Sequence, residues 1–283
     1  MPAANAWRLI NSASLEAVPA ALARARGNGV ARCLAGGDWL IRRKHDGRYL
    51  ASLNIGGRGS HRCRLIEPAN LARIDRAEWL ELVERAGRRH PPTAGDRVLP
   101  LTGVRRRLME LGIGPDYGER HALSLIPEPG ELRLAGFDRY RRPLWLLAAA
   151  ARAWQALHRA ATREGVALDV ISGYRSHDYQ VAIIRRKLGR GQTIDDILRV
   201  NAAPGYSEHH SGRALDIGCP GQAPADIGFE TTPAFAWLRE HGARFGFRLS
   251  YPRDNPHGID YEPWHWCWQP CPLAGHAGSG RSV

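Results

Sequence analysis

The pattern of apolar and polar residues divides the chain into a smaller N-terminal part and a larger C-terminal part. In the N-terminal part, an alanine-rich apolar run predicts a helix over 15–26, and Asp46-Gly47 between two strand-like runs predicts a β-hairpin. Strands are expected at 31–34, 39–43, 48–55 and around 62–66, and a helix with an approximate apolar stripe at 68–87. These elements predict a small α+β unit that ends at a proline-containing linker over 88–95.

The C-terminal part carries longer helical patterns between short apolar runs. Apolar residues recur at helical spacing after Pro143, so a helix is expected over 143–161 with the proline in its first turn. Further helices are expected near 103–111 and at 178–188, 193–200 and 233–242, and strands at 166–172, 214–217, 245–251 and 264–268. This order of elements predicts an α+β fold with a central, mainly antiparallel sheet and flanking helices.

The same pattern sets the expected domain boundaries. Residues 1–95 are expected to form an N-terminal α+β accessory domain, 96–129 a linker with a short helix, 130–275 the larger domain, and 276–283 a flexible tail. Because the helix stripe and the hairpin of the N-terminal part need burial, this part is expected to fold rather than to remain a disordered basic tail.

The composition is that of an ordinary globular protein. The chain has 283 residues, of which 43% are apolar and 24% charged, and these values exclude fibrous, low-complexity and wholly disordered proteins. No apolar run approaches the ~20 residues that a membrane-spanning helix needs. The N-terminal apolar stretch contains Pro19, follows Glu16 and makes a poor signal peptide. The expected location is therefore the cytoplasm, with the periplasm as the alternative.

Charge and cysteine content add little to this picture. Basic residues outnumber acidic ones by 40 to 28, which gives a formal net charge of +12. Such an excess can attract acidic polymers, but a diffusely basic surface is the favoured interpretation and no nucleic acid partner is expected. The five cysteines are too sparse for a disulfide scaffold, and no CxxC pair indicates structural zinc. Cys267 and Cys271 are close enough in sequence to pair, although free thiols are favoured.

Candidate chemistry is concentrated in two segments, 207–216 (SEHHSGRALD) and 261–266 (YEPWHW). Neutral imidazole and carboxylate groups are the ligands of catalytic zinc sites, in which three protein ligands leave a fourth position open. Such a set could come from His209, Asp216 and His265, with Glu262 beside it as a base. Spacing alone is weak evidence, because any one of these histidines is more often a satisfied surface or core side chain.

Three motifs, taken together, resemble those of a known family. They are Ser207-x-His209-x2-Gly212-x-Ala214-x-Asp216, then Glu262-Pro263-Trp264-His265, and upstream of both Ser172-Gly173-Tyr174-Arg175-Ser176 followed by Gln180. In this order, and over about residues 130–270, the chain resembles the VanY-type D-alanyl-D-alanine carboxypeptidases. These belong to the LAS zinc metallopeptidases, which include D-Ala-D-Ala dipeptidases and hedgehog-like domains. One departure is Cys267, at a position where many relatives carry arginine.

The resemblance implies one zinc ion per chain, held in the sheet of the larger domain. The implied ligands are His209, Asp216 and His265. Glu262 would be the general acid/base, and Arg175 would steady the substrate carbonyl or its oxyanion. Ser207 and Gln180 would contact the peptide terminus, whereas His210 falls on a variable position and stays outside the metal set.

The function expected from this resemblance is removal of a terminal D-alanine from peptidoglycan stem peptides. With a cytoplasmic location, the substrates would be recovered tetrapeptides or muropeptides, and the reaction that of an L,D-carboxypeptidase. A D,D-carboxypeptidase acting on pentapeptides and a D-Ala-D-Ala dipeptidase stay open, because the motifs do not separate them. A different class is a non-catalytic metal-binding module whose basic N-terminal part binds a polymer. Glu262 and Arg175 argue against it, since a structural zinc site needs neither. Oligomeric state is left open.

Overall fold

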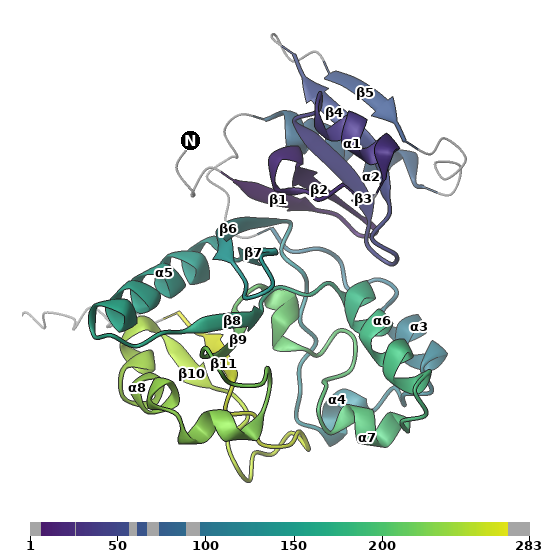
Figure 1. Cartoon of the computed structure of the whole chain (residues 1–283). Coiled ribbons are helices and arrows are strands. Elements are labelled where there is room, and N and C mark those ends of the chain that lie inside the picture. Colours follow the sequence, from purple (N-terminus) through teal and green to yellow (C-terminus); the bar gives the residue numbers. More distant parts are fainter. Residues whose placement is uncertain (1–6, 26, 57–60, 67–73, 89–96, 271–283) are drawn as a thin grey trace, which may run out of the picture.

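The computed structural model describes residues 7–25, 27–56, 61–66, 74–88 and 97–270 (Figure 1). Two antiparallel sheets organise this part of the chain, and helices cover both of them. The prediction of antiparallel sheets with flanking helices is thereby confirmed. Within the described ranges, no helix has the length and apolar character needed to cross a membrane. Most of the expected linker at 88–95 and the tail at 276–283 lie outside the described residues.

The larger sheet has seven strands, in the order β5-β4-β3-β2-β1-β6-β7. Their bounds are β1 Arg8–Asn11, β2 Leu15–Pro19, β3 Trp39–Arg43, β4 Tyr49–Ile55, β5 His61–Leu65, β6 Glu131–Phe137 and β7 Pro143–Leu146. The predicted hairpin is confirmed, because β3 and β4 pair antiparallel and Gly47 in their turn has φ +66°. Only glycine adopts that left-handed conformation without strain, which explains the Asp-Gly signal.

Two helices cover opposite faces of the N-terminal sheet. Successive residues of a strand point to opposite faces, and in β1 Leu9 packs in one apolar cluster whereas Ile10 packs in another. Helix α1 (Asn28–Leu34) joins the cluster of Leu9, and helix α2 (Arg76–Gly87) joins that of Ile10. Asp75 caps α2 by accepting hydrogen bonds from two backbone amides of its first turn.

Several predictions for this sheet are wrong in a consistent way. The helix expected over 15–26 is the strand β2 followed by a short 3-10 helix, Ala20–Leu22, and the strand expected at 31–34 belongs to α1. The helix expected over 143–161 begins only at Ala148, because Pro143–Leu146 is strand β7. In β2 and β7 the apolar run is paired on a neighbouring strand and buried, and this tertiary pairing overrides local helix propensity.

The second sheet has four strands in the order β10-β11-β9-β8 and lies in the C-terminal part of the chain. Its strands are β8 Asp169–Ser172, β9 Ala214–Gly218, β10 Phe247–Leu249 and β11 His265–Trp268. Helices α5 (Ala148–Arg163) and α8 (Pro233–His241) pack against it in one extended apolar core. The strand expected at 245–251 is shorter than predicted, because a 3-10 helix, Gly242–Phe245, precedes it.

A separate group of helices flanks this sheet on the other side (Figure 1). It comprises α3 Val104–Glu110, α4 Tyr117–Arg120, α6 His177–Leu188 and α7 Ile194–Leu198. They share a second apolar core around the fully buried Tyr117. The segments that carry the candidate chemistry include strands β9 and β11 of the four-stranded sheet.

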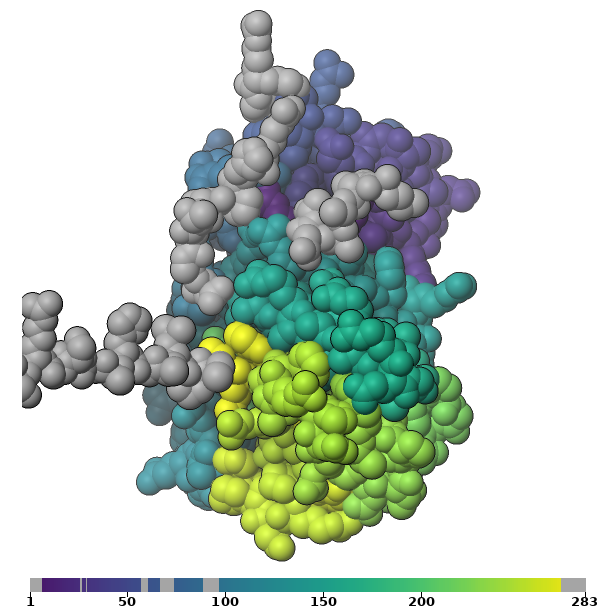
Figure 2. Space-filling view, turned by 90° about the vertical axis from the view of Figure 1, so that its left-hand side faces the viewer, coloured from purple at the N-terminus to yellow at the C-terminus, as the bar shows by residue number. Residues whose placement is uncertain are grey.

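Strands β6 and β7 connect the two parts of the molecule. By sequence they fall in the expected 130–275 domain, yet β6 pairs with β1 and extends the N-terminal sheet. In the space-filling view, the purple N-terminal unit sits directly on the teal segment that contains them (Figure 2). The domain boundaries stay a prediction. The seven-stranded sheet includes strands from both sides of the boundary expected at residue 130.

Candidate functional site

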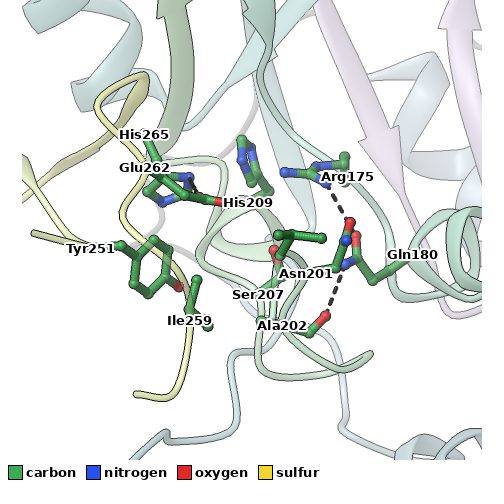
Figure 3. A pocket seen from close by; sticks show the side chains of 11 residues that line it. Arg175, Gln180, Asn201, Ala202, Ser207, His209, Tyr251, Ile259, Glu262 and His265 are labelled. Atoms are coloured by element: carbon green, nitrogen blue, oxygen red, sulfur yellow. Dashed lines mark hydrogen bonds and ion pairs between the residues drawn. The ribbon is translucent and has the colours of Figure 1, made fainter. Parts of the chain in front are cut away.

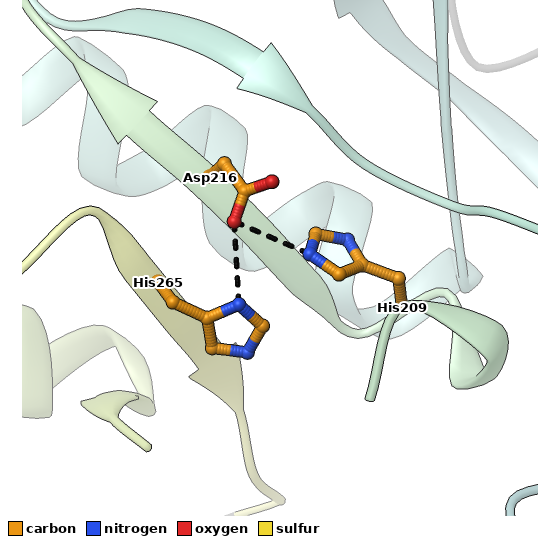
Figure 4. A group of neighbouring side chains, drawn as sticks. All are labelled: His209, Asp216 and His265. Carbon is orange, nitrogen blue, oxygen red and sulfur yellow. Dashed lines mark hydrogen bonds and ion pairs between the residues drawn. The ribbon is translucent and has the colours of Figure 1, made fainter. Parts of the chain in front are cut away.

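The three proposed metal ligands come from neighbouring elements and converge. His209 lies in the 3-10 helix Glu208–Ser211, Asp216 in β9, and His265 is the first residue of β11. In the pairing of β9 with β11, His265 and Asp216 are direct partners. All three side chains are buried, and their ligand atoms lie within 4.8 Å of one another (Figure 4).

Hydrogen bonds on the outer side of each imidazole fix which nitrogen faces the centre. Nδ1 of His209 lies 2.7 Å from the carbonyl oxygen of Gly173, and Nε2 of His265 lies 2.9 Å from Glu208 Oε2. These nitrogens are therefore assigned as donors, so that in neutral rings the inward nitrogens carry lone pairs. Each inward nitrogen is 3.2 Å from Asp216 Oδ1. Lone pairs that face a carboxylate oxygen require a proton or a cation between them.

The charge balance of the cluster agrees with a cation site. Burial, together with the charge of Arg175, lowers the pKa of His209 to about 4, so this imidazole is neutral at pH 7. Burial would raise the pKa of Asp216, but the neighbouring His209, His265 and Arg175 hold it well below its usual range. Burial would lower the pKa of His265, but hydrogen bonds to Asp216 and Glu208 raise it to about 10. The site therefore favours a positive charge at His265, which a metal ion on Nδ1 would supply in place of the proton.

The donor set also fits a small divalent metal. Tetrahedral zinc bound at ~2.1 Å places neighbouring donors ~3.4 Å apart, close to the two 3.2 Å separations. Neutral imidazole and carboxylate are the donors that zinc accepts. This cluster could therefore hold a metal ion.

A small pocket opens beside the cluster and collects the other predicted site residues (Figure 3). It is lined by Arg175, Gln180, Val200, Asn201, Ala202, Ser207, His209, Tyr251, Ile259, Glu262 and His265. Every catalytic, substrate-binding and metal residue predicted from the sequence lines this pocket or, in the case of Asp216, contacts two residues that do. The structure brings the whole predicted set together.

Glu262 and Arg175 carry opposite formal charges on the walls of this pocket. Glu262 Oε2 lies 3.7 Å from His265 Nδ1, and burial raises the pKa of Glu262 to about 7. Arg175 Nη2 lies 3.5 Å from Asp216 Oδ2, and its buried Nε has no hydrogen-bond partner among the described residues. A carboxyl group with a pKa near neutrality can exchange protons at pH 7, and a fixed guanidinium can bind an anionic or polarised oxygen.

The two predicted substrate contacts differ in how free their side chains are. Gln180 is 1% exposed, and its amide donates to the carbonyl of Ala202 at 2.8 Å and accepts from Arg175 at 3.4 Å. These bonds tie the pocket wall together, so Gln180 holds Arg175 in place. Ser207 is also buried and lines the pocket directly before the 3-10 helix of His209.

The Gly212 position of the central motif has a steric explanation. Gly212 ends the 3-10 helix with φ +67°, and a Cβ there would lie 3.0 Å from the backbone nitrogen of Leu147. That nitrogen donates to the carbonyl of Gly212 at 2.8 Å. A glycine therefore allows the chain to turn from His209 into β9 while it packs closely against the segment before α5.

His210 has a structural position, in agreement with its exclusion from the metal set. Its Nδ1 bonds the carbonyl oxygen of Arg175 at 2.7 Å, and its Nε2 accepts from the amide of Gly205 at 3.1 Å. Burial lowers its pKa well below the ordinary value, so it is a neutral ring that fixes the backbone of the Arg175 segment.

Glu208 is a functional candidate that the sequence reasoning missed. Its carboxylate accepts hydrogen bonds from the outer nitrogen of His265 and from Ser250. Burial would raise the pKa of Glu208, but His265 first and Ser250 second lower it. The sequence feature that could have indicated Glu208 is its position directly before the ligand histidine His209, but its partner is the other histidine, His265, 57 positions away.

Cys267, the departure from the family pattern, is a buried free thiol beside Glu208. Cys271 lies outside the described residues.

Comparisons with known proteins agree with these motifs. The family model VanY, described as D-alanyl-D-alanine carboxypeptidase, matches residues 144–271. The putative carboxypeptidase YodJ of Bacillus subtilis (strain 168) is 30% identical over 162 residues, which cover 52% of this chain and 56% of that protein. A solved LdcB LD-carboxypeptidase structure aligns with a TM-score of 0.44 and 28% identity, over 50% of this chain and 69% of that one.

A third relative has the coverage that decides family membership. The bifunctional D-Ala-D-Ala dipeptidase and D-Ala-D-Ala carboxypeptidase VanXYC of Enterococcus gallinarum is 31% identical over 154 residues, covering 52% of this chain and 78% of that protein. Averaged over the four curated relatives, the matched region spans about half of the relative's length. With the three motifs assembled around one buried cluster, the chain belongs to the VanY family of D-alanyl-D-alanine carboxypeptidases.

Proposed function

We propose that the chain is a zinc carboxypeptidase that removes the terminal D-alanine from peptidoglycan stem peptides. The observation that carries this proposal is the buried cluster of His209, Asp216 and His265, in which the inward nitrogens of two imidazoles each lie 3.2 Å from one carboxylate oxygen. Glu262 and Arg175 line the pocket beside it. A structural metal site needs no such base and no such cation, so their presence favours catalysis over a purely structural role.

One zinc ion per chain would be held by the three ligands. When bound, zinc acts as a Lewis acid that makes water a nucleophile at neutral pH. Glu262 would accept the proton of that water on its carboxylate and pass it to the leaving amine. Its pKa of about 7, raised by burial, suits both directions of transfer. Arg175 would bind the carbonyl oxygen of the scissile amide as negative charge develops there.

The pocket favours a small terminal residue. Its cavity volume is about 30 Å³, and Val200, Ala202 and Ile259 supply apolar wall around the polar groups. A methyl side chain would fit such a space, and we expect a long or aromatic side chain to fit less well. Ser207 and Gln180 line the same pocket and would contact the peptide terminus. Gln180 would also help to position Arg175, from which it accepts a hydrogen bond.

Among the possible substrates, we propose tetrapeptides and muropeptides recovered from wall turnover, which makes the reaction that of an L,D-carboxypeptidase. D,D-cleavage of pentapeptides and dipeptidase activity are the alternatives. The cytoplasmic location stays a prediction from the sequence, and fractionation of cells that express the protein tests it directly.

The test is a panel of three substrates presented to zinc-loaded protein: a tetrapeptide, a pentapeptide and D-Ala-D-Ala. Release of D-alanine from the tetrapeptide, abolished by a chelator and in the Glu262→Gln variant, is the expected result. Release from the pentapeptide alone would contradict the L,D assignment, and cleavage of the free dipeptide alone would indicate a dipeptidase. No release from any substrate by zinc-loaded protein would refute the enzyme and favour a non-catalytic metal-binding module.

A further inference from the structure

A buried carboxylate, Glu128, lies where the N-terminal unit meets the catalytic part. It gathers two residues of the N-terminal sheet and its turns, Lys44 and Asn11, and two residues of the catalytic part, Tyr174 and His177. We call these five residues the Glu128 network. The side chains of Lys44 and Glu128 are 1% and 5% exposed, so this contact is shielded from solvent.

Each member of the network donates a hydrogen bond to Glu128. The Lys44 ammonium and the Tyr174 hydroxyl both bond Oε2, which Asn11 Nδ2 reaches at 3.1 Å, and the His177 amide bonds Oε1 at 2.9 Å. Burial would raise the pKa of Glu128, but the charges of Lys44 and His177 and these bonds lower it to about 2. The carboxylate is therefore ionised, and Lys44, which also donates to the carbonyl of Ser12 at 2.9 Å, is the cation that balances it.

The catalytic side of the network is the segment that carries Arg175. Tyr174 directly precedes Arg175, and His177 begins α6 two residues after it. The same segment is bonded to the metal-ligand helix, because the Arg175 amide donates to the carbonyl of His209 at 3.2 Å and Gly173 accepts from His209 Nδ1. The segment is thus fixed by Glu128 on one side and by the 3-10 helix that carries His209 and His210 on the other.

From this arrangement we propose that Lys44 is a positioning residue of the active site. Through Glu128 it holds Tyr174 and His177, and thereby sets the position of the Arg175 guanidinium in the pocket. The inference rests on the proposed function for the role of Arg175. It also gives the N-terminal unit a task in catalysis, in place of a passive stabilising role or the binding of a polymer.

The first arm of the test is a double-mutant cycle on kcat/KM. Lys44→Met keeps the length of the side chain and removes its charge, and we expect it to lower kcat/KM roughly 10- to 100-fold, the scale of an ångström-sized displacement of a reacting group. In the Arg175→Ala background the same change is expected to cost less than about threefold, because Lys44 acts through Arg175. Equal losses in both backgrounds would overturn the inference.

Two further variants separate positioning from folding. Tyr174→Phe removes only the hydroxyl, which donates to Glu128 and accepts from Asn11, and it keeps the buried ion pair. It is expected to reproduce much of the Lys44→Met loss. Arg8→Met is the matched control, since Arg8 is a buried cation of the same sheet that bonds Glu131 and the carbonyls of Arg85 and Arg88. It is expected to lower the melting temperature and leave kcat/KM of the folded enzyme unchanged. A loss in Arg8→Met as large as that in Lys44→Met would refute a specific role.

The second arm does not depend on activity. Because the His177 amide donates to Glu128, hydrogen exchange of a peptide that spans 173–180 is expected to accelerate in zinc-loaded Lys44→Met and to stay unchanged in Arg8→Met. The same exchange rate in both variants would refute the positioning inference even if the protein is active. If the wild-type chain releases no D-alanine, the proposed function is refuted. The exchange comparison would still test whether Lys44 positions the Arg175 segment.

Discussion

Removal of the Glu208 carboxylate is predicted to weaken zinc binding without touching a ligand. The outer nitrogen of His265 donates to Glu208 Oε2 at 2.9 Å, in a site where His265 is 3% exposed. A hydrogen bond to a charged group contributes about 1.5–3 kcal/mol, which corresponds to a roughly 10- to 150-fold change in a binding constant. Outer partners of metal-binding histidines typically account for about 10- to 100-fold in affinity. We therefore expect the zinc affinity of Glu208→Ala to be about 10- to 100-fold lower than that of the wild type.

The mechanism of this loss makes a second variant informative. Without the carboxylate, His265 loses the acceptor that keeps its proton on Nε2 and its Nδ1 lone pair directed at the metal. Glu208→Gln keeps an acceptor oxygen and removes the charge, so its affinity should lie between those of the wild type and Glu208→Ala. The order wild type, Gln, Ala is the expected ranking.

The assay is competition for zinc against a chromogenic chelator of known affinity, at fixed pH and ionic strength. Glu240→Ala is the matched control, because Glu240 lies 3.8 Å from His241 Nε2 on the surface, with its side chain 76% exposed. It should bind zinc as the wild type does. If Glu208→Ala also binds zinc within about threefold of the wild type, the reasoning that Glu208 orients His265 is refuted.

Four further outcomes follow from the structure. Glu262→Gln should keep its zinc and lose roughly 10²–10⁴-fold in turnover, measured with metal content on the same sample, and full activity would sink the acid/base role. His209→Ala should instead lose zinc, which elemental analysis detects. The free energy of unfolding of the wild type should exceed that of Glu128→Gln by roughly 3 kcal/mol above pH 4.5. This difference should disappear as the pH falls toward about 2, because the pKa of Glu128 in the folded protein lies below its ordinary value of 4.5. Urea titrations across this range measure it, and a difference that does not change with pH would contradict the reasoning. Gly212→Ala should lower both melting temperature and zinc affinity, since its Cβ would press on the backbone before α5; a fully stable variant with normal zinc binding would contradict that.

The residues of the candidate site could be picked out from the sequence because few residue types bind a metal such as zinc. Only a few side chains bind zinc, so His209, Asp216 and His265 stand out once their motifs occur in order. The hairpin at Gly47 could be predicted for a similar reason, since its φ of +66° suits few residues. Glu208 could not be predicted as a site residue, because no local sequence feature indicates that its partner is a histidine 57 positions away.

Other parts of the fold depend on partners that are distant in sequence. The apolar runs of β2 and β7 have no local feature that distinguishes a buried strand from a buried helix. Their state is decided by pairing, with β1 and β3 for one and with β6 for the other. The ion pair of Lys44 with Glu128 is of the same kind, because its two residues are 84 positions apart and each alone reads as an ordinary surface charge.

The pairing of β1 with β6 has a consequence for how the chain can be made and divided. Arg8 of β1 and Glu131 of β6 are 123 positions apart and bond between two adjacent strands of the sheet. During synthesis, one edge of β1 therefore stays unpaired until β6 has left the ribosome, and such an edge can pair with other chains. Cutting the gene at residue 130 would make that exposure permanent in both fragments. Each half is expected to aggregate when expressed alone and to recover when the two are produced together.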